Sequence, residues 1–237
     1  MRLDKLIEAQ FKTSKKQTKR LFLSQQVLVD GKMITQENKN VDSDLHDIQV
    51  ARKKLYTHEH YFLMNKPKGV VTAKSDPKFQ TFLDLMDKED RFEELTSAGR
   101  LDRDTEGLLF LTTNGQLVYE LSQNKKKVKK MYEVQVNGAL TKEDQLAFEQ
   151  GIIFYDGTLC QKAHLDVLYS SSCFSKGIIT ITEGKRHQIK KMCLACGKKV
   201  ISLKRLSIGT LTLGDLASGS YRALTTNELI ELKSYFC

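Results

Sequence analysis

Residues 99–115 place a strongly charged loop directly before a continuous apolar run. Positions 108–111 are all apolar and Asn114-Gly115 follows shortly after, which predicts a buried strand that ends in a turn. The preceding segment, 99–107, has no apolar period and has glycine at both ends, as is typical of a loop. A rigid strand that carries such a loop is a common support for functional side chains.

The charges in this loop are arranged around Asp102. Arg100 and Arg103 flank it, and Asp104 and Glu106 follow. A nucleophilic carboxylate must stay ionised where water is excluded, and a neighbouring guanidinium both opposes its protonation and orients it. Asp102 is therefore a candidate nucleophile, although a solvated loop or a structural ion-pair network has a similar composition.

The overall charge narrows the class of partner. The 237-residue chain carries 38 Lys and Arg against 29 Asp and Glu, a net charge of +9. This balance favours a polyanionic partner, nucleic acid ahead of an anionic membrane surface. The sequence contains no run of about 18 apolar residues, so it predicts no membrane span. It also has no apolar core near Met1, so it predicts no signal peptide. We therefore expect a cytoplasmic protein, and its five cysteines suit a reducing compartment.

Cys193 and Cys196 have the spacing of a zinc-ligand pair, but the sequence offers no second pair. With Ile189 and Met192 they instead fall at i, i+3, i+4 and i+7, the spacing of an apolar helix face. We expect both cysteines in the core and no metal. No dinucleotide fingerprint or P-loop is present, so we expect no cofactor.

Residues 1–54 predict a small domain. Positions 3–11 keep a helical period, and Ser14 with Gln17 forms a capping box for a second helix. Asp30-Gly31 predicts a hairpin turn, and positions 48–50 a further strand. We expect a linker at 55–59 and a second domain at 60–237.

The first 54 residues contain 12 Lys and Arg against 7 Asp and Glu. In the second helix, Lys15, Lys16, Lys19 and Arg20 group along one side because they pair at i and i+4. Such cations suit phosphate contacts, which carry no base information. A solvated helix face remains the alternative.

The remainder predicts a mixture of strands and helices, and so an α+β fold. The expected strands are 61–65, 70–72, 131–136, 152–155, 165–168, 178–182 and 200–203. The expected helices are 79–86, 116–122, 141–150, 189–196 and a last one capped by Thr225 and Glu228.

A run of five lysines within 125–130 precedes the strand that begins near Tyr132. Lysines beside a strand suit a phosphate-binding track, although a charge run is usually only a solvated surface. The tyrosine itself would ordinarily be a half-buried core aromatic.

Three of these segments resemble motifs of the RNA pseudouridine synthases, in their ribosomal small-subunit synthase A branch. Residues 99–115 resemble the family signature G-R-L-D-R-D-T-E-G-L-L-x-L-T-x-[ND]-G. Residues 65–70 resemble N-K-P-x-G-[VY], and residues 183–192 resemble E-G-[KR]-x-H-Q-[IV]-[KR]-[KR]-M. Two helices followed by V-x-V-D-G-K resemble an S4 RNA-binding domain. The resemblance extends over nearly the whole chain.

The resemblance implies an S4 domain followed by a catalytic domain built on a mixed, largely antiparallel sheet with flanking helices. It implies that a uridine is flipped out of its stack and isomerised to pseudouridine. Asp102 would be the nucleophile, kept ionised and aimed by Arg100 and Lys190. Tyr132 would stack on the uracil and accept the C5 proton. Many relatives have arginine where this chain has Lys190, and lysine offers only a point charge.

The charge pattern and the resemblance together predict which side chains contact RNA. The expected RNA-binding residues are Arg2, Lys5, Lys15, Lys16, Lys19, Arg20, Lys66, Lys125, Lys126, Lys127, Arg186, His187 and Lys191. The expected partner is ribosomal RNA, 16S rRNA in an assembling small subunit, bound by a monomeric enzyme that contacts no membrane.

Three alternatives remain open at this point. The first is a synthase that acts on 23S rRNA, and the second is a non-catalytic RNA-binding or ribosome-assembly factor. The third is a glycosidase that uses Asp102 and Asp104 as an acid/base pair. We disfavour it because residues two apart on an extended loop point in opposed directions, whereas glycosidases need a set separation between their carboxyl groups.

Overall fold

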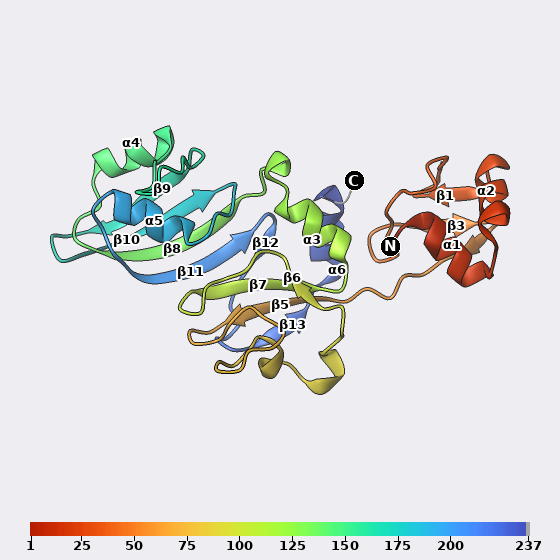
Figure 1. Cartoon of the computed structure of the whole chain (residues 1–237), viewed down its shortest axis with the longest axis horizontal. Coiled ribbons are helices and arrows are strands. Elements are labelled where there is room, and N and C mark those ends of the chain that lie inside the picture. Colours follow the sequence, from red (N-terminus) through yellow and green to blue (C-terminus); the bar gives the residue numbers. More distant parts are fainter. Residues whose placement is uncertain (236–237) are drawn as a thin grey trace.

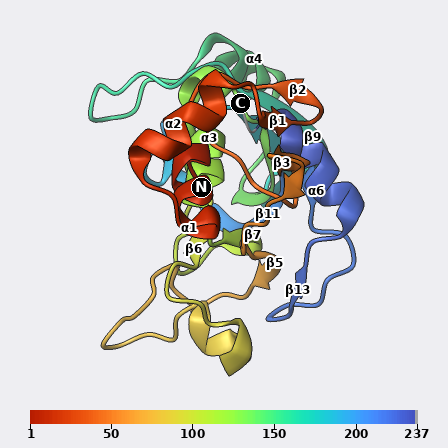
Figure 2. The same ribbon diagram turned by 90° about the vertical axis from the view of Figure 1, so that its right-hand side faces the viewer.

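The computed structural model describes residues 1–235, in which a small N-terminal unit lies at one end of a larger one (Figure 1). In the small unit, the two predicted helices pack on a four-stranded antiparallel sheet with the order β2-β1-β3-β4. Its elements are α1 (Leu3–Phe11), α2 (Lys15–Leu23), β1 (Val27–Val29), β2 (Lys32–Met33), β3 (Ile48–Val50) and β4 (Lys53–Lys54). The capping box at Ser14 and the hairpin at Asp30-Gly31 are confirmed. In Figure 2 this unit faces the viewer, with the larger unit behind it.

The core of the small unit reaches slightly beyond its last strand. Leu55, the first residue of the expected linker, is 1% exposed and packs against Leu3, Ile7 and Ile48 in one apolar cluster.

The loop between β2 and β3 attaches the small unit to the larger one through a buried carboxylate. Asp42 is fully buried and accepts hydrogen bonds from Thr57 Oγ1 at 3.1 Å and Asn114 Nδ2 at 2.6 Å. The hydroxyl of Tyr61 also donates to Asp42. Because a buried carboxylate is costly to leave unpaired, these bonds hold the loop against the larger unit.

The larger unit is built on a nine-stranded mixed sheet with the order β13-β5-β7-β11-β8-β10-β9, with β12 paired to β11 and β6 to β7. All pairings between its named strands are antiparallel except that of β7 with β11. The strands are β5 (Tyr61–Lys66), β6 (Thr96–Ser97), β7 (Glu106–Thr112), β8 (Lys130–Asn137), β9 (His164–Ser170), β10 (Phe174–Ile181), β11 (Val200–Ile208), β12 (Leu211–Thr212) and β13 (Tyr221–Ala223). The expected mixed, largely antiparallel sheet is confirmed.

The helices of the larger unit are α3 (Gly115–Ser122), α4 (Lys142–Gln150), α5 (Gln188–Ala195) and α6 (Thr226–Leu232), with short 3-10 turns at Leu83–Leu85, Lys88–Asp90, Asn124–Lys126 and Lys233–Tyr235. Capping boxes at Thr141 and Thr225 begin α4 and α6, as predicted. No helix within residues 1–235 is both long and apolar enough to cross a membrane. The same residues contain no group of three or more His, Cys, Asp or Glu side chains placed to hold a metal ion.

The parallel pairing joins two halves of the sheet, β13-β5-β7 and β11-β8-β10-β9. In the described residues this join has two register positions, Lys204 opposite Glu106 and Arg205 opposite Gly107. Gly107 has φ +101°, and a Cβ there would lie 2.2 Å from the carbonyl oxygen of Arg205. Only glycine permits the two backbones to approach so closely.

Three predicted elements are wrong. The segment 79–86 is not an α-helix, because only the short 3-10 turn Leu83–Leu85 forms there. The side chain of Asp84, in this turn, accepts a hydrogen bond from the backbone amide of Thr81. Residues 70–72 and 152–155 are not strands, and each makes one isolated bridge. At 152–155 the apolar alternation is real, but the chain turns back on itself, with the amide of Phe154 bonded to the Thr158 carbonyl.

Candidate active site

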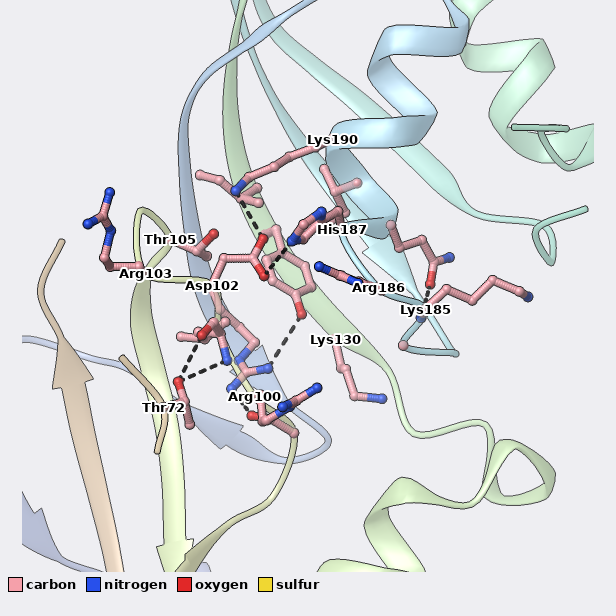
Figure 3. A pocket seen from close by; sticks show the side chains of 18 of the residues that line it. Thr72, Arg100, Asp102, Arg103, Thr105, Lys130, Lys185, Arg186, His187 and Lys190 are labelled. Atoms are coloured by element: carbon pink, nitrogen blue, oxygen red, sulfur yellow. Dashed lines mark hydrogen bonds and ion pairs between the residues drawn. The ribbon is translucent and has the colours of Figure 1, made fainter. Parts of the chain in front are cut away.

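A cavity of about 680 Å³ opens where the two halves of the sheet meet. Its wall is formed by the loop after β5, the charged loop 99–105, β8, the turn before α5, and β11. In that wall, Thr105 is buried, and its Oγ1 has no hydrogen-bond partner in the described part of the chain. Because these wall segments are far apart in the sequence, the cavity brings together side chains from distant parts of the chain (Figure 3).

Asp102 lines this cavity between the side chains of Lys190 and His187 (Figure 3). Lys190 Nζ is 2.9 Å from Asp102 Oδ2, and His187 Nε2 is 3.4 Å from Oδ1. Lys190 also contacts Asp104 Oδ1 at 2.6 Å. Burial lowers the pKa of Lys190, but its hydrogen bonds to Asp104 and Asp102 outweigh this and raise the pKa overall. The expected pairing of Lys190 with Asp102 is present.

The beginning of α5 positions these two side chains. His187 takes a left-handed conformation with φ +53° immediately before the helix. Gln188 fixes the turn, because its side chain accepts from the amide of Lys185 at 2.9 Å and donates to Glu183 at 2.8 Å. The other face of the helix is apolar, with Met192 and Cys193 buried.

The two cysteines of this helix lie on its inner side. Cys193 is 1% exposed, and burial raises its thiol pKa to about 12. Cys196 is half-buried and packs against the same core, and both thiols are free. Core packing, as predicted from their spacing, is confirmed.

Tyr132 borders the cavity from the middle of the sheet. It lies on β8, where it is 8% exposed and alternates inward with Val134 and Val136. Arg205 lies beside it, with the guanidinium carbon 5.9 Å from the ring centroid and Nη1 3.5 Å from the phenol oxygen. The Tyr132 ring and Arg205 both line the cavity.

Arg205 was not identified from the sequence. It is 1% exposed, and it donates from Nε to the Leu108 carbonyl at 2.7 Å and from Nη2 to the Gly99 carbonyl at 2.9 Å. Its signal in the sequence is a cation at an inward position of a strand, because Leu203, Arg205 and Ser207 alternate inward along β11.

Arg100 does not hold Asp102, which corrects the expectation for this residue. It is exposed, and it makes no hydrogen bond or ion pair with any residue from 1 to 235. Figure 3 shows its side chain extending toward Lys130 and away from Asp102. The side chain beside Asp102 on this side is instead that of His187, one of the residues expected to contact RNA.

Lys66 does not reach the surface, so the prediction that it contacts the RNA backbone is wrong. It is fully buried, and its ammonium donates to the carbonyls of Pro67 and Val70, both at 2.8 Å. A third carbonyl, that of Arg103, lies 3.4 Å away. Burial lowers the pKa of Lys66 to about 8. Through the Arg103 carbonyl, the side chain of Lys66 contacts the charged loop from inside the protein.

A second support reaches the loop from the segment after β5. Thr72 Oγ1 donates to the Leu101 carbonyl at 2.8 Å, and the Leu101 amide donates back to this oxygen at 3.2 Å. Both the amide and the carbonyl of Leu101, the residue before Asp102, are therefore hydrogen-bonded to Thr72.

The remaining expected RNA-binding residues form two groups. One group is exposed, and its side chains make no hydrogen bond or ion pair within residues 1–235: Lys15, Lys16, Lys19, Arg20, Lys125, Lys127 and Arg186. The other group pairs with a nearby carboxylate, at Arg2–Asp4 (2.7 Å), Lys5–Glu8 (2.7 Å), Lys126–Glu120 (3.7 Å) and Lys191–Asp156 (2.7 Å). Of all these residues, Arg186 lines the cavity. Their contact with RNA stays a prediction.

Lys130 ends the lysine run, and with Tyr132 it matches the K-x-Y context of the family's stacking tyrosine; both residues line the cavity. It is half-buried, and burial together with the nearby charge of Arg205 lowers its pKa. This places an ammonium group with a weakened hold on its proton next to the ring.

Comparison with known proteins identifies the family. Residues 60–195 match the family model described as RNA pseudouridylate synthase. An uncharacterized RNA pseudouridine synthase of Bacillus subtilis is 40% identical over 97% of both chains. Ribosomal small subunit pseudouridine synthase A of Escherichia coli is 33% identical over 97% of this chain and 98% of its own.

A crystal structure of a pseudouridylate synthase superposes with a TM-score of 0.68 and 29% identity, over 98% of this chain and 99% of that one. Fold, motifs and full-length relatives agree. The chain therefore belongs to the RNA pseudouridine synthases, in the branch of the small-subunit synthases A, and it is an isomerase that converts uridine in RNA to pseudouridine.

Proposed function

We propose that this enzyme modifies a uridine of 16S rRNA in an assembling small ribosomal subunit, with Asp102 as its nucleophile. The observation that carries the proposal is the placement of Asp102, which is bonded to Lys190 at 2.9 Å and lines the same cavity as Tyr132. The rRNA target is supported by the relatives of Escherichia coli and Vibrio cholerae, which are ribosomal small subunit pseudouridine synthases A and match over nearly their whole length.

In the proposed reaction, a carboxylate oxygen of Asp102 attacks C1′ as the bond from C1′ to N1 breaks. The uracil turns within the cavity, and a bond from C5 to C1′ then forms while the bond from C1′ to Asp102 breaks. C5 loses its proton and N1 gains one, so the atoms and charges balance. Lys190 holds Oδ2 at 2.9 Å, which fixes the direction of the carboxylate.

Tyr132 is the proposed platform for the extruded base. Its ring lines the cavity next to Arg205, whose guanidinium carbon lies 5.9 Å from the ring centroid. Stacking on an aromatic ring is worth about 1–3 kcal/mol per base, which offsets the few kcal/mol that extrusion costs. We assign the removal of the C5 proton to the hydroxyl of the same residue.

The N-terminal unit is the proposed S4 domain, and α2 is its RNA-binding helix. Its cations at positions 15, 16, 19 and 20 are exposed and unpaired among residues 1–235, so a phosphate contact breaks no existing ion pair. Within this proposal the enzyme works as a cytoplasmic monomer. The four described cysteines, which are free thiols, suit that compartment.

The test is tritium release from 16S and 23S rRNA labelled as 5-³H-uridine, in free RNA and in partly assembled particles. Wild type is compared with Asp102→Asn and with the control Asp166→Asn, an exposed aspartate of β9. We expect release from 16S rRNA, lost in Asp102→Asn and kept in the control.

Release from 23S rRNA alone would keep the chemistry and contradict the substrate. Equal release by Asp102→Asn and wild type would contradict the assignment of the nucleophile.

A further inference from the structure

We propose that Arg205 is a positioning residue that sets the distance between the nucleophile and the base-stacking ring. This rests on the proposed roles of Asp102 and Tyr132. In this role Arg205 contributes no atom to the reaction. It acts by holding the loop that carries Asp102 against the strand that carries Tyr132.

The two groups to be aligned belong to different halves of the sheet. The loop that carries Asp102 leads into β7, while Tyr132 lies on β8 beyond β11. The halves are joined at the two register positions of the parallel pairing, one of which is Arg205 opposite Gly107. Arg205 therefore stands on the boundary across which the alignment must be kept.

All three guanidinium nitrogens of Arg205 take part in contacts across that boundary. Nε reaches the carbonyl of Leu108 at 2.7 Å, and Nη2 reaches that of Gly99 at 2.9 Å, so the two ends of the charged loop are fixed to one rigid plane. Nη1 of the same plane lies 3.5 Å from the hydroxyl of Tyr132.

The electrostatic setting argues that this arrangement has a role beyond stability. Arg205 is 1% exposed and makes no ion pair with a carboxylate among residues 1–235. A buried cation that lacks a counter-ion is costly, and a well-packed apolar side chain of similar size is often the more stable choice. A planar fork that ties the loop to Tyr132 is something an apolar side chain does not supply.

The main test compares Arg205→Lys with wild type in single-turnover tritium release and in RNA binding. Lysine keeps the charge and loses the fork. The control is Arg222→Lys, which removes a fork of similar kind, bound to Glu228 at 2.7 and 2.8 Å on β13. We expect the rate constant of Arg205→Lys to fall about 100-fold, because a shift of about 1 Å in reacting groups costs that much.

We expect the dissociation constant for RNA to stay within about threefold, and Arg222→Lys to keep the wild-type rate constant. A rate constant of Arg205→Lys within threefold of wild type would overturn the proposal. A fall of equal size in Arg222→Lys would overturn it as well.

A second measurement is independent of activity, so it separates this proposal from the proposed function. Hydrogen exchange followed by mass spectrometry is compared between wild type and Arg205→Lys, with Arg205→Gln as a second variant. We expect amides of residues 99–108 to exchange at least tenfold faster while those of Tyr61–Lys66 on β5 keep their rate. Unchanged exchange at 99–108, or an equal rise throughout the chain, would overturn the positioning role even if the enzyme is active on RNA.

Discussion

The basic side chains of α2 differ in their bonding partners from two basic side chains of the cavity, Lys190 and Arg205. On α2, Lys15, Lys16 and Lys19 are exposed and make no ion pair within the described residues. In the cavity, Lys190 is shared between two carboxylates, and Arg205 is bonded to two backbone carbonyls. The same residue types thus serve in one place as free charge and in the other as fixed geometry.

The difference teaches how substitutions at the two places should be read. Free charges act on RNA affinity through counter-ion release, without selecting a base. Fixed charges act on the alignment of reacting groups, and so on the rate constant. The comparison holds if cavity variants change turnover and α2 variants change binding.

The largest effect is expected at Lys190. Lys190→Met leaves Asp102 and Asp104 without their shared cation, so we expect kcat to fall at least about 100-fold. Lys190→Arg is the matched variant, which restores a cation and should keep kcat within about tenfold. Multiple-turnover tritium release measures both variants. A Lys190→Met enzyme with wild-type kcat would break the comparison on the cavity side.

The next effect is on the join between the halves of the sheet. Gly107→Ala should lower the free energy of unfolding by more than about 2 kcal/mol, because the new Cβ would lie 2.2 Å from the Arg205 carbonyl oxygen. Gly157→Ala is the control, since Gly157 has φ +79° and a Cβ added there would have no atom within 4 Å. That control should cost only about 1–2 kcal/mol for the backbone conformation. Urea unfolding of both variants measures the difference, and equal costs would refute the close approach.

The third effect tests the free charges. The double variant Lys15→Gln/Lys19→Gln should weaken RNA binding about tenfold at 0.1 M salt and lower the salt dependence of log K by about 1.4. At saturating RNA, kcat should not change. The control Lys88→Gln/Lys142→Gln removes the same charge from exposed positions of the larger unit. A similar loss of affinity in the control would show that only net charge matters.

The smallest effect concerns Lys66, a buried cation held by carbonyls. Because burial lowers its pKa to about 8, the unfolded chain binds more protons between that value and the ordinary 10.5, and stability contributed by this site rises with pH there. The wild type should gain about 1 kcal/mol by pH 9 relative to Lys66→Met, which cannot titrate. Urea unfolding at pH 7 and pH 9 measures this, and a parallel pH dependence of the two proteins would contradict it.

The sequence predicted what is encoded within single segments. The charged loop before a buried strand and the apolar face with Cys193 are local patterns, and both are present. Asp102 and Lys190 were found through local motifs, although 88 positions separate them. The mixed sheet followed from the family resemblance.

The remainder depends on contacts between distant segments. Arg205 is bonded to carbonyls 97 and 106 positions away, and its role exists only because β7 and β11 pair. Arg100 was expected at Asp102 because of their proximity in sequence, but the side chain of His187 fills that place. Lys66 follows a buried strand, and only the folded loop shows that three carbonyls surround its ammonium.

The buried carboxylate of Asp42 has a consequence for target choice. Its bonds to Tyr61 and Asn114, together with the 2.8 Å ion pair from Lys233 to Asp30, hold the N-terminal unit at a set position on the larger one. The proposed RNA-binding helix α2 and the proposed nucleophile Asp102 are then held at a fixed distance from each other. Under the proposed roles of α2 and Asp102, an RNA bound at both places would present a uridine to Asp102 only if its fold spans the fixed distance between them.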